Sequence, residues 1–141
     1  MIVADDLGWD DVSFHGSPQI PTPALDALAN NGVILNNYYV SPLDTPSRAS
    51  FMTGKYPIHL GLQHDTIHNR QAMGVPLEEK FLPQYLREQG YKTHAVGKWQ
   101  LGFFSKEYTP RIEDSIRSLD SGHQIRITIN TCPMMVDMAL I

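Results

Sequence analysis

The sequence lacks the features of several common classes of site. Its single cysteine, Cys132, cannot close an internal disulfide, and no Cys-x-x-Cys pair is present to hold a metal ion. No run of Lys and Arg occurs and the net charge is −4, which argues against a nucleic-acid partner because phosphate contacts need clustered cations. No stretch of about 18 apolar residues occurs either, so the sequence predicts no membrane span.

Three familiar catalytic patterns are also missing. A P-loop needs a glycine five positions before its Gly-Lys pair, and Ala49 and Lys92 stand in that place before the two Gly-Lys pairs here. Ser47 is not part of a Gly-x-Ser-x-Gly nucleophile elbow. His64 and His68 have the spacing of a helical zinc pair, but their segment has no helix pattern and no Glu beside the first His.

The composition is typical of one globular domain with a modest core. The chain has 141 residues, of which 42% are hydrophobic and 18% charged. Its opening, MIVADDLGWDD, lacks the basic segment and long apolar run of a signal peptide. It predicts instead the end of a buried strand over residues 1–4.

Short apolar segments alternate with segments whose Pro and Gly residues mark helix starts and ends. Thr-Pro pairs at Thr22 and Thr45 predict N-caps, with the proline at the first helical position. The predicted helices start at Pro23, Pro46 and Pro83 and stop at Gly32, Gly54 and Gly90; the predicted strands are 1–4, 33–40, 91–96 and 124–130. This alternation predicts an α/β fold with a mostly parallel sheet flanked by helices.

Polar residues follow the predicted strands, where ligands of such sheets bind. Asp5 and Asp6 follow the first strand, and Asp44 and Lys98 follow later ones. Two adjacent carboxylates before a glycine turn suit a hard divalent cation such as Ca²⁺ or Mg²⁺, and they also suit a solvated acidic turn. Both interpretations stay open on spacing alone.

The segment from Asp44 to Arg48 has the features of an anion site. A helix N-terminus offers unpaired N–H groups and a positive dipole end, and the planar guanidinium of Arg48 suits a tetrahedral oxyanion. The alternative is a well-capped surface helix with a solvated Arg. Asp44 is unexpected at this position, because it places an anion at the mouth of an anion pocket.

Four segments in order resemble the N-terminal part of the sulfatase family, most closely its arylsulfatase B type with the arylsulfatase I and J relatives. They are ADDLGWDDVSFHGS, TPALDALANNGVILNNYYVSPLDTPSRASFMTGKYPIHLGLQH, VPLEEKFLPQYLREQGYKTHAVGKWQLG and KEYTP. The resemblance implies a fragment of the alkaline-phosphatase-like sulfatase fold over residues 1–110. Residues 111–141 are expected to be a divergent tail without a family match.

The resemblance also implies roles for single residues. Sulfatases cleave sulfate esters with a formylglycine, made from the Cys of Cys-x-Pro-x-Arg, and with Ca²⁺. Asp5 and Asp6 match metal ligands, Arg48 matches the residue that steadies the formylglycine, and Lys98 matches a sulfate-binding lysine. Metal and cations then take up the charge that develops on the sulfate oxygens.

Two positions depart from the family pattern. The formylglycine position is Asp44, which has no thiol to oxidise, so the formylglycine-generating enzyme is an expected partner only if position 44 were Cys. Asp44 is therefore expected at the catalytic position, and as an added metal ligand. Gln100 replaces the usual His of the Gly-Lys-Trp-His-Leu-Gly loop and cannot shuttle protons near neutral pH. The later metal ligands and catalytic groups of the family have no counterpart in residues 111–141.

The expected function is a calcium-dependent arylsulfatase-type hydrolase, impaired at Asp44, that acts on a sulfated small molecule or glycan. A lysosomal or secreted location is implied by the resemblance alone, since no signal peptide is recognised. The alternative is a non-catalytic relative that at most binds metal or a sulfated ligand. A phosphoryl-transfer enzyme with an aspartyl nucleophile is disfavoured because Pro46 stands where that chemistry sets its second Asp.

Overall fold

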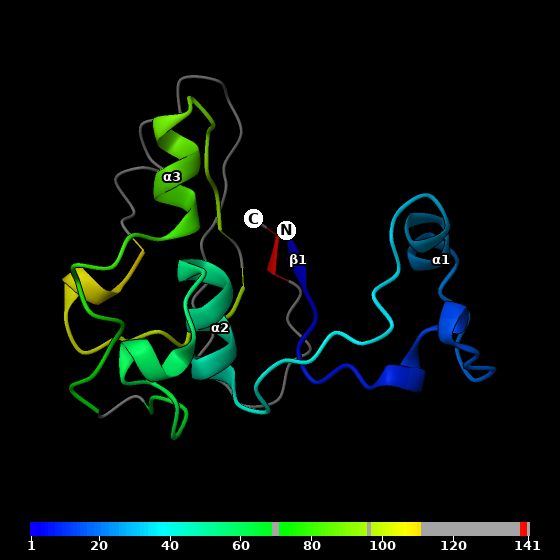
Figure 1. The fold of residues 1–141 in the computed structure, drawn as a ribbon, viewed down its shortest axis with the longest axis horizontal. Helices are drawn as coiled ribbons and strands as arrows, with labels where there is room; N and C mark the ends of the chain where they lie inside the picture. The colour runs from blue at the N-terminus through cyan, green and yellow to red at the C-terminus, as the bar shows by residue number, and fades with distance from the viewer. Residues whose placement is uncertain (69–70, 96, 111–138, 141) are drawn as a thin grey trace. The chain divides into compact units, whose positions relative to one another are not determined.

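A computed structural model of the chain describes residues 1–68, 71–95, 97–110 and 139–140 (Figure 1). The chain divides into two compact units, Ala4–Tyr39 and the combination of Met1–Val3 with Val40–Ile141, and each is described by itself. The predicted strand over residues 124–130, Cys132 and most of the predicted tail lie outside the described residues.

The unit Ala4–Tyr39 packs one α-helix against short 3₁₀ turns. Its elements are η1 (Trp9–Asp11), η2 (Ser13–His15) and α1 (Pro23–Asn30). The hydroxyl of Ser13 donates to the Asp26 carboxylate at 2.7 Å, which fastens η2 to α1. The rings of Trp9 and His15 stack with centroids 3.7 Å apart, which holds together the two ends of the segment between them.

The helix predicted from Thr22-Pro23 is confirmed as α1, with Thr22 as its N-cap residue. The Thr22 hydroxyl does not cap the helix, however. It accepts the backbone N–H of Ser13 at 2.9 Å and donates to Asp26. The Thr22 hydroxyl therefore links η2 to α1 instead of capping α1. The apolar side chains of Leu25 and Leu28 on α1 are exposed.

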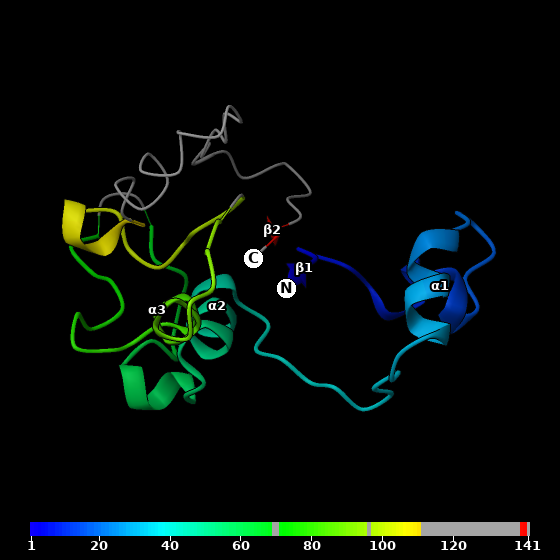
Figure 2. The ribbon, with the colours of Figure 1, turned by 90° about the horizontal axis from the view of Figure 1, so that it is seen from above.

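The other unit carries the core. Its elements are β1 (Ile2–Val3), α2 (Asp44–Thr53), η3 (Pro57–Leu60), α3 (Leu82–Glu88), η4 (Lys106–Tyr108) and β2 (Ala139–Leu140). Helix α2 lies beside α3 in both views and also contacts η3 (Figures 1 and 2). The buried core cluster consists of Ala49, Met52, Leu60, Leu62, Ile67, Val75 and Leu101, with Phe51, Phe81 and Trp99 packed against it.

Two further helix predictions hold within a residue or two. Helix α2 starts at Asp44, two residues before the predicted Pro46, and Leu43 rather than Thr45 is the N-cap residue. Gly54 ends the helix with a φ of 71°, a left-handed conformation that glycine adopts without steric cost. Helix α3 starts at Leu82, next to the predicted Pro83. None of the described helices is long and apolar enough to cross a membrane.

The predicted strands are shorter than expected or not formed. β1 pairs antiparallel with β2, with Ile2 opposite Leu140, and Ile2 is 53% exposed, so the predicted buried first strand is short and not buried. The predicted strand 33–40 is wrong: the segment contains no strand, and Val33 is 85% exposed.

Residues 91–95 also contain no strand, and residue 96 lies outside the described residues. β-Branched and aromatic residues become strands only when a neighbouring strand pairs with them. No described residue pairs with either predicted strand, and the mostly parallel sheet is therefore not confirmed.

Candidate functional site

The first turn of α2 and the loop at residues 97–102 together hold the catalytic candidates of the sequence. Asp44 is the first residue of α2 and Arg48 lies four residues on, so both project from one face of the helix. Lys98 and Gln100 come from the loop 97–102. The structure brings these four residues together in one unit.

Asp44, Arg48 and Lys98 form a group of charged side chains, here called the Asp44 cluster. Lys98 Nζ donates to Asp44 Oδ2 at 2.7 Å, and Arg48 Nε lies 3.5 Å from Asp44 Oδ1. Arg48 Nη1 donates to the backbone carbonyl of Lys98 at 2.7 Å. The side chains of Asp44, Lys98 and Arg48 are 25%, 21% and 6% exposed. Both cations therefore face one carboxylate in a largely buried setting.

The helix start also explains why a carboxylate is tolerated there. The first backbone N–H groups of an α-helix carry partial positive charge, which stabilises an anionic side chain in the first turn. Asp44 occupies that turn while Arg48 and Lys98 add two full charges. The side chains of Asp44, Arg48 and Lys98 together carry a formal charge of plus one at the N-terminal end of α2.

Thr45 connects the loop 97–102 to α2 through hydrogen bonds. Its side chain is fully buried. Its hydroxyl donates to the Gln100 backbone carbonyl at 2.7 Å and accepts the Ile67 N–H at 3.0 Å. The Gln100 side-chain amide donates to the Ile67 carbonyl at 3.0 Å, which closes a ring of three residues. Gln100 thus acts as a structural contact, in addition to any role at the site.

The backbone of this loop is unusual at Gln100. Its φ of 55° is the left-handed region that side chains other than glycine rarely adopt. The neighbouring glycine, Gly102, has a φ of 117° and lies against Gly74, where the two residues form a bridge. The loop is further held by Trp99, whose Nε1 donates to the Tyr108 carbonyl at 2.8 Å.

Asp5 and Asp6 belong to the other unit, Ala4–Tyr39, and both follow β1 as the sequence predicts. Asp6 has a φ of 54°, so the chain turns sharply at this carboxylate. Among the described residues, no group of three or more His, Cys, Asp or Glu side chains could hold a metal ion. The expected metal roles of Asp5, Asp6 and Asp44 stay predictions. His64 and His68 belong to no such group among the described residues either.

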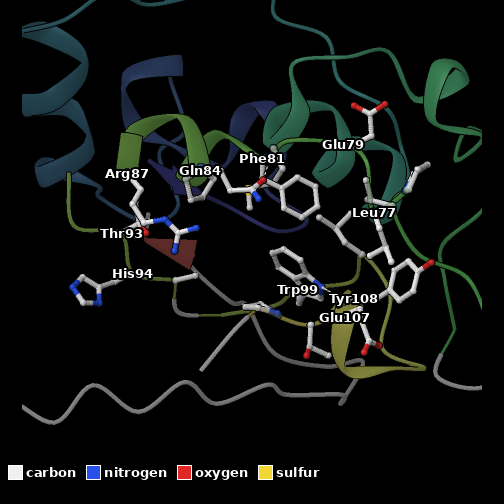
Figure 3. Close-up of a pocket in the computed structure, with 18 residues that line it drawn as sticks. Leu77, Glu79, Phe81, Gln84, Arg87, Thr93, His94, Trp99, Glu107 and Tyr108 are labelled. Carbon is white, nitrogen blue, oxygen red and sulfur yellow. Dashed lines mark hydrogen bonds between the residues drawn. The ribbon is translucent and has the colours of Figure 1, made fainter. Parts of the chain in front are cut away.

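A cavity of about 530 Å³ lies in the same unit as the Asp44 cluster (Figure 3). Figure 3 shows Phe81 and Trp99 side by side at its centre, with Arg87 from α3 on one side and Tyr108 from η4 on the other. None of Asp44, Arg48 and Lys98 lines it. The cavity is therefore a feature separate from the charged cluster.

The sequence reasoning missed the central contact of the site. The sequence predicts Thr45 as a helix cap, but the partners of its hydroxyl lie 22 and 55 residues further along the chain. No local pattern signals a hydroxyl that bridges two distant backbone groups. The Thr-Pro pair marks the right helix, and it is the local sequence signal at this residue.

The chain matches the sulfatase family over residues 1–126. It belongs to the sulfatase family. The match covers most of the chain and extends past residue 110, so the expected domain boundary there stays a prediction.

The relatives of this sulfatase-family chain are much longer than the chain itself. It is 57% identical over 109 residues to arylsulfatase J of Mus musculus, a match covering 77% of this chain and 18% of that protein. It is 39% identical over 110 residues to N-acetylgalactosamine-6-sulfatase of Homo sapiens, covering 72% of this chain and 21% of that protein. The chain thus spans about a fifth of the length of these relatives.

A solved structure, Ps i-CgsB, shares the fold with a TM-score of 0.70 and 42% identity, covering 75% of this chain and 24% of that one. The same protein in complex with k-i-k-neocarrahexaose matches equally well. The expectation of a sulfatase-type fold is confirmed by the family match and this likeness, while the sheet stays a prediction.

Proposed function

We propose that this chain is the part of an arylsulfatase-type hydrolase that holds the anion-binding end of the active site. The family match supports sulfate-ester hydrolysis in general. The observation that carries the proposal for this chain is the convergence of Arg48 and Lys98 on residue 44 at the start of α2. Two fixed cations at a helix N-terminus suit the charge that a sulfate ester develops when it is cleaved.

The chain is proposed to be impaired as an enzyme. Asp44 stands at the position of the formylglycine-forming Cys and offers no thiol for that modification. Its carboxylate repels the sulfate it would have to meet, and Gln100 does not replace the proton transfer of a His. Loss of a covalent nucleophile lowers turnover by several orders of magnitude.

The family is metal-dependent, and Ca²⁺ is the ion proposed for this chain. The carboxylates of Asp5 and Asp6 are hard oxygen donors and fit such an ion in kind, with Asp44 as a further candidate. Three carboxylates supply fewer than the about six to eight oxygens that Ca²⁺ takes, so other ligands would complete the site. A bound Ca²⁺ would supply polarisation of the sulfate oxygens.

The proposed ligand is a sulfated small molecule or glycan. The complex of Ps i-CgsB with k-i-k-neocarrahexaose supports a carbohydrate ligand for a protein of similar fold. A lysosomal or secreted location is proposed by analogy with the family. The formylglycine-generating enzyme is a partner only of a chain with Cys at position 44.

The alternative is a non-catalytic relative that binds metal or sulfated ligand at most. The position of the Asp44 carboxylate between two cations favours this alternative for the chain as it stands, because an anion already neutralises the side chains that would bind sulfate. The two candidates differ in what happens when the nucleophile is restored.

Turnover of a chromogenic aryl sulfate in the presence of Ca²⁺ tests the proposal. The variant Asp44→Cys/Gln100→His is made in a full-length sulfatase-family chain that carries residues 1–110, because the chain alone spans about a fifth of its relatives. It is co-expressed with the formylglycine-generating enzyme, and its conversion to the aldehyde is checked by mass spectrometry. The matched control, Asp44→Ala/Gln100→His, cannot be converted. We expect turnover above the control for the converted variant and none for the natural chain. A fully converted variant no more active than the control would reject the hydrolase and leave the non-catalytic alternative.

A further inference from the structure

Residues 33–40, with the sequence VILNNYYV, form an exposed segment that is largely hydrophobic. All eight residues are exposed, Val33 to 85% and Tyr39 to 86%. Among the described residues, none pairs with this segment in a strand or a bridge. Because β-branched and aromatic residues favour strands, the segment has the composition of a strand that lacks a partner.

The composition of residues 33–40 is also that of strands that pair with copies of themselves. The segment contains no Pro, no Gly and no charged residue, which is typical of self-pairing segments of about six or seven residues. Gly32 precedes the segment, and Pro42, which has no N–H to donate, follows shortly after it. The length that can pair is therefore limited on both sides.

The order of the residues favours a second copy of the same segment over other occupants. The two central residues, Asn36 and Asn37, are polar, and three hydrophobic residues stand on each side of them. When two copies run antiparallel with residue 36 opposite residue 37, every hydrophobic side chain faces a hydrophobic one. The facing residues are then Val33 and Val40, Ile34 and Tyr39, Leu35 and Tyr38, and Asn36 and Asn37. A shift by one residue places an Asn opposite a hydrophobic side chain instead.

We propose that residues 33–40 are an interface through which this chain associates with further copies of itself, as antiparallel strands in that register. Residues 36 and 37 form a turn in the single chain, and this turn opens when the strands extend. Each strand has two edges, so further copies can add to a pair and association grows with protein concentration. The inference uses nothing of the sulfate-ester chemistry of the proposed function, so the two can fail separately.

Sedimentation velocity of the 141-residue chain over a wide range of concentrations measures the association. Infrared spectroscopy measures the antiparallel strand that forms with it. The decisive variants change two facing residues. Ile34→Lys/Tyr39→Lys places like charges opposite each other, and Ile34→Lys/Tyr39→Glu places opposite charges there. We expect the Lys/Lys variant to associate at least about tenfold more weakly than the natural chain, and the Lys/Glu variant at least about tenfold more tightly than the Lys/Lys variant.

Two comparisons separate this interface from other causes of association. The two lysines bring the net charge of −4 to −2, and a smaller net charge by itself promotes association, so overall charge predicts the opposite result. Leu28→Lys removes a hydrophobic side chain that is 65% exposed on α1, and is expected to leave association unchanged. Circular dichroism checks that each variant keeps the helices. If a double variant loses them, the same pair of changes at Leu35 and Tyr38 replaces it.

A natural chain that stays monomeric at every concentration would overturn the proposal and leave the segment to another occupant. A Lys/Lys variant that associates as tightly as the natural chain would overturn it, because the segment would then not be the interface. Equal association of the Lys/Lys and Lys/Glu variants would contradict the register. A loss of the same size in Leu28→Lys would show that association follows exposed hydrophobic side chains in general, and would overturn the proposal as well.

Discussion

Thr45 and Gln100 are 55 residues apart in sequence, and the hydroxyl of the first donates a 2.7 Å hydrogen bond to the backbone carbonyl of the second. The same hydroxyl accepts the N–H of Ile67. A single buried side chain therefore fixes the loop that carries Lys98 to the helix that carries Arg48. The charged cluster depends on this neutral contact for its geometry.

Replacing Thr45 by Val is expected to destabilise the chain. The two side chains have nearly the same shape, but valine leaves the Ile67 N–H and the Gln100 carbonyl without the hydroxyl between them. Each unsatisfied buried group costs about 1–3 kcal/mol, so the free energy of unfolding should fall by about 2–4 kcal/mol. Urea unfolding followed by circular dichroism measures the change.

The matched control is Thr53→Val, at the other end of the same helix. The Thr53 hydroxyl donates to the Ala49 carbonyl of its own helix, at 2.7 Å, and bridges no distant loop. Its loss should lower the free energy of unfolding by less than about 1 kcal/mol. Equal losses at Thr45 and Thr53 would show that the bridge contributes nothing special.

The sequence predicted the helices of this fold better than its strands. Proline and glycine act locally, so the Pro at Pro23 and the Gly at Gly54 mark helix limits wherever the rest of the chain lies. Strands depend on partners. The segment 33–40 has strand-forming residues, but no described residue pairs with it, and it is not a strand.

The proximity of the candidate residues was predictable from the resemblance, while their roles stay predictions. Resemblance to the sulfatase family singled out Asp44, Arg48, Lys98 and Gln100, and the structure places all four together. The bridging role of Thr45 was not predictable, because it arises from contacts between segments far apart in sequence. Only the folded chain shows which loop meets which helix.

A second prediction concerns Gly102, where the loop 97–102 approaches the chain at Gly74. A Cβ at Gly102 would lie 2.7 Å from the Gly74 Cα and 2.9 Å from the Met73 carbonyl oxygen. Gly90 also has a positive φ, but a Cβ there would meet nothing within 4 Å. Alanine at either position carries the conformational cost, and only Gly102→Ala adds a clash with backbone.

Thermal and urea unfolding of the two alanine variants measure this difference. We expect Gly102→Ala to lose about 1–3 kcal/mol more of the free energy of unfolding than Gly90→Ala, because backbone atoms cannot move aside as a side chain can. Equal losses would mean that the loop relaxes away from Gly74 without cost.

The left-handed backbone at Gln100 leads to a third prediction. Its φ of 55° disfavours a β-branched side chain most strongly and an Asn least among residues with a Cβ. We expect Gln100→Val to lower the free energy of unfolding by about 2–3 kcal/mol, through backbone strain and the lost bond to the Ile67 carbonyl. Gln100→Asn should cost about 1 kcal/mol, since it carries only the weakened bond. Similar losses for both, in urea unfolding, would argue against strain at this residue.

The last prediction concerns the proposed metal ligands. If Asp5 supplies oxygen to Ca²⁺, then Asp5→Asn removes one negative charge from the site. Fewer negatively charged ligands bind Ca²⁺ more weakly. Calorimetric titration with Ca²⁺ should show at least about tenfold weaker binding, equivalent to about 1.4 kcal/mol. Asp10→Asn is the matched control, because Asp10 is an exposed acid a few residues away and is not proposed as a ligand. Equal Ca²⁺ affinity in the natural chain and both variants would remove Asp5 from the metal site, whatever the outcome at Asp44.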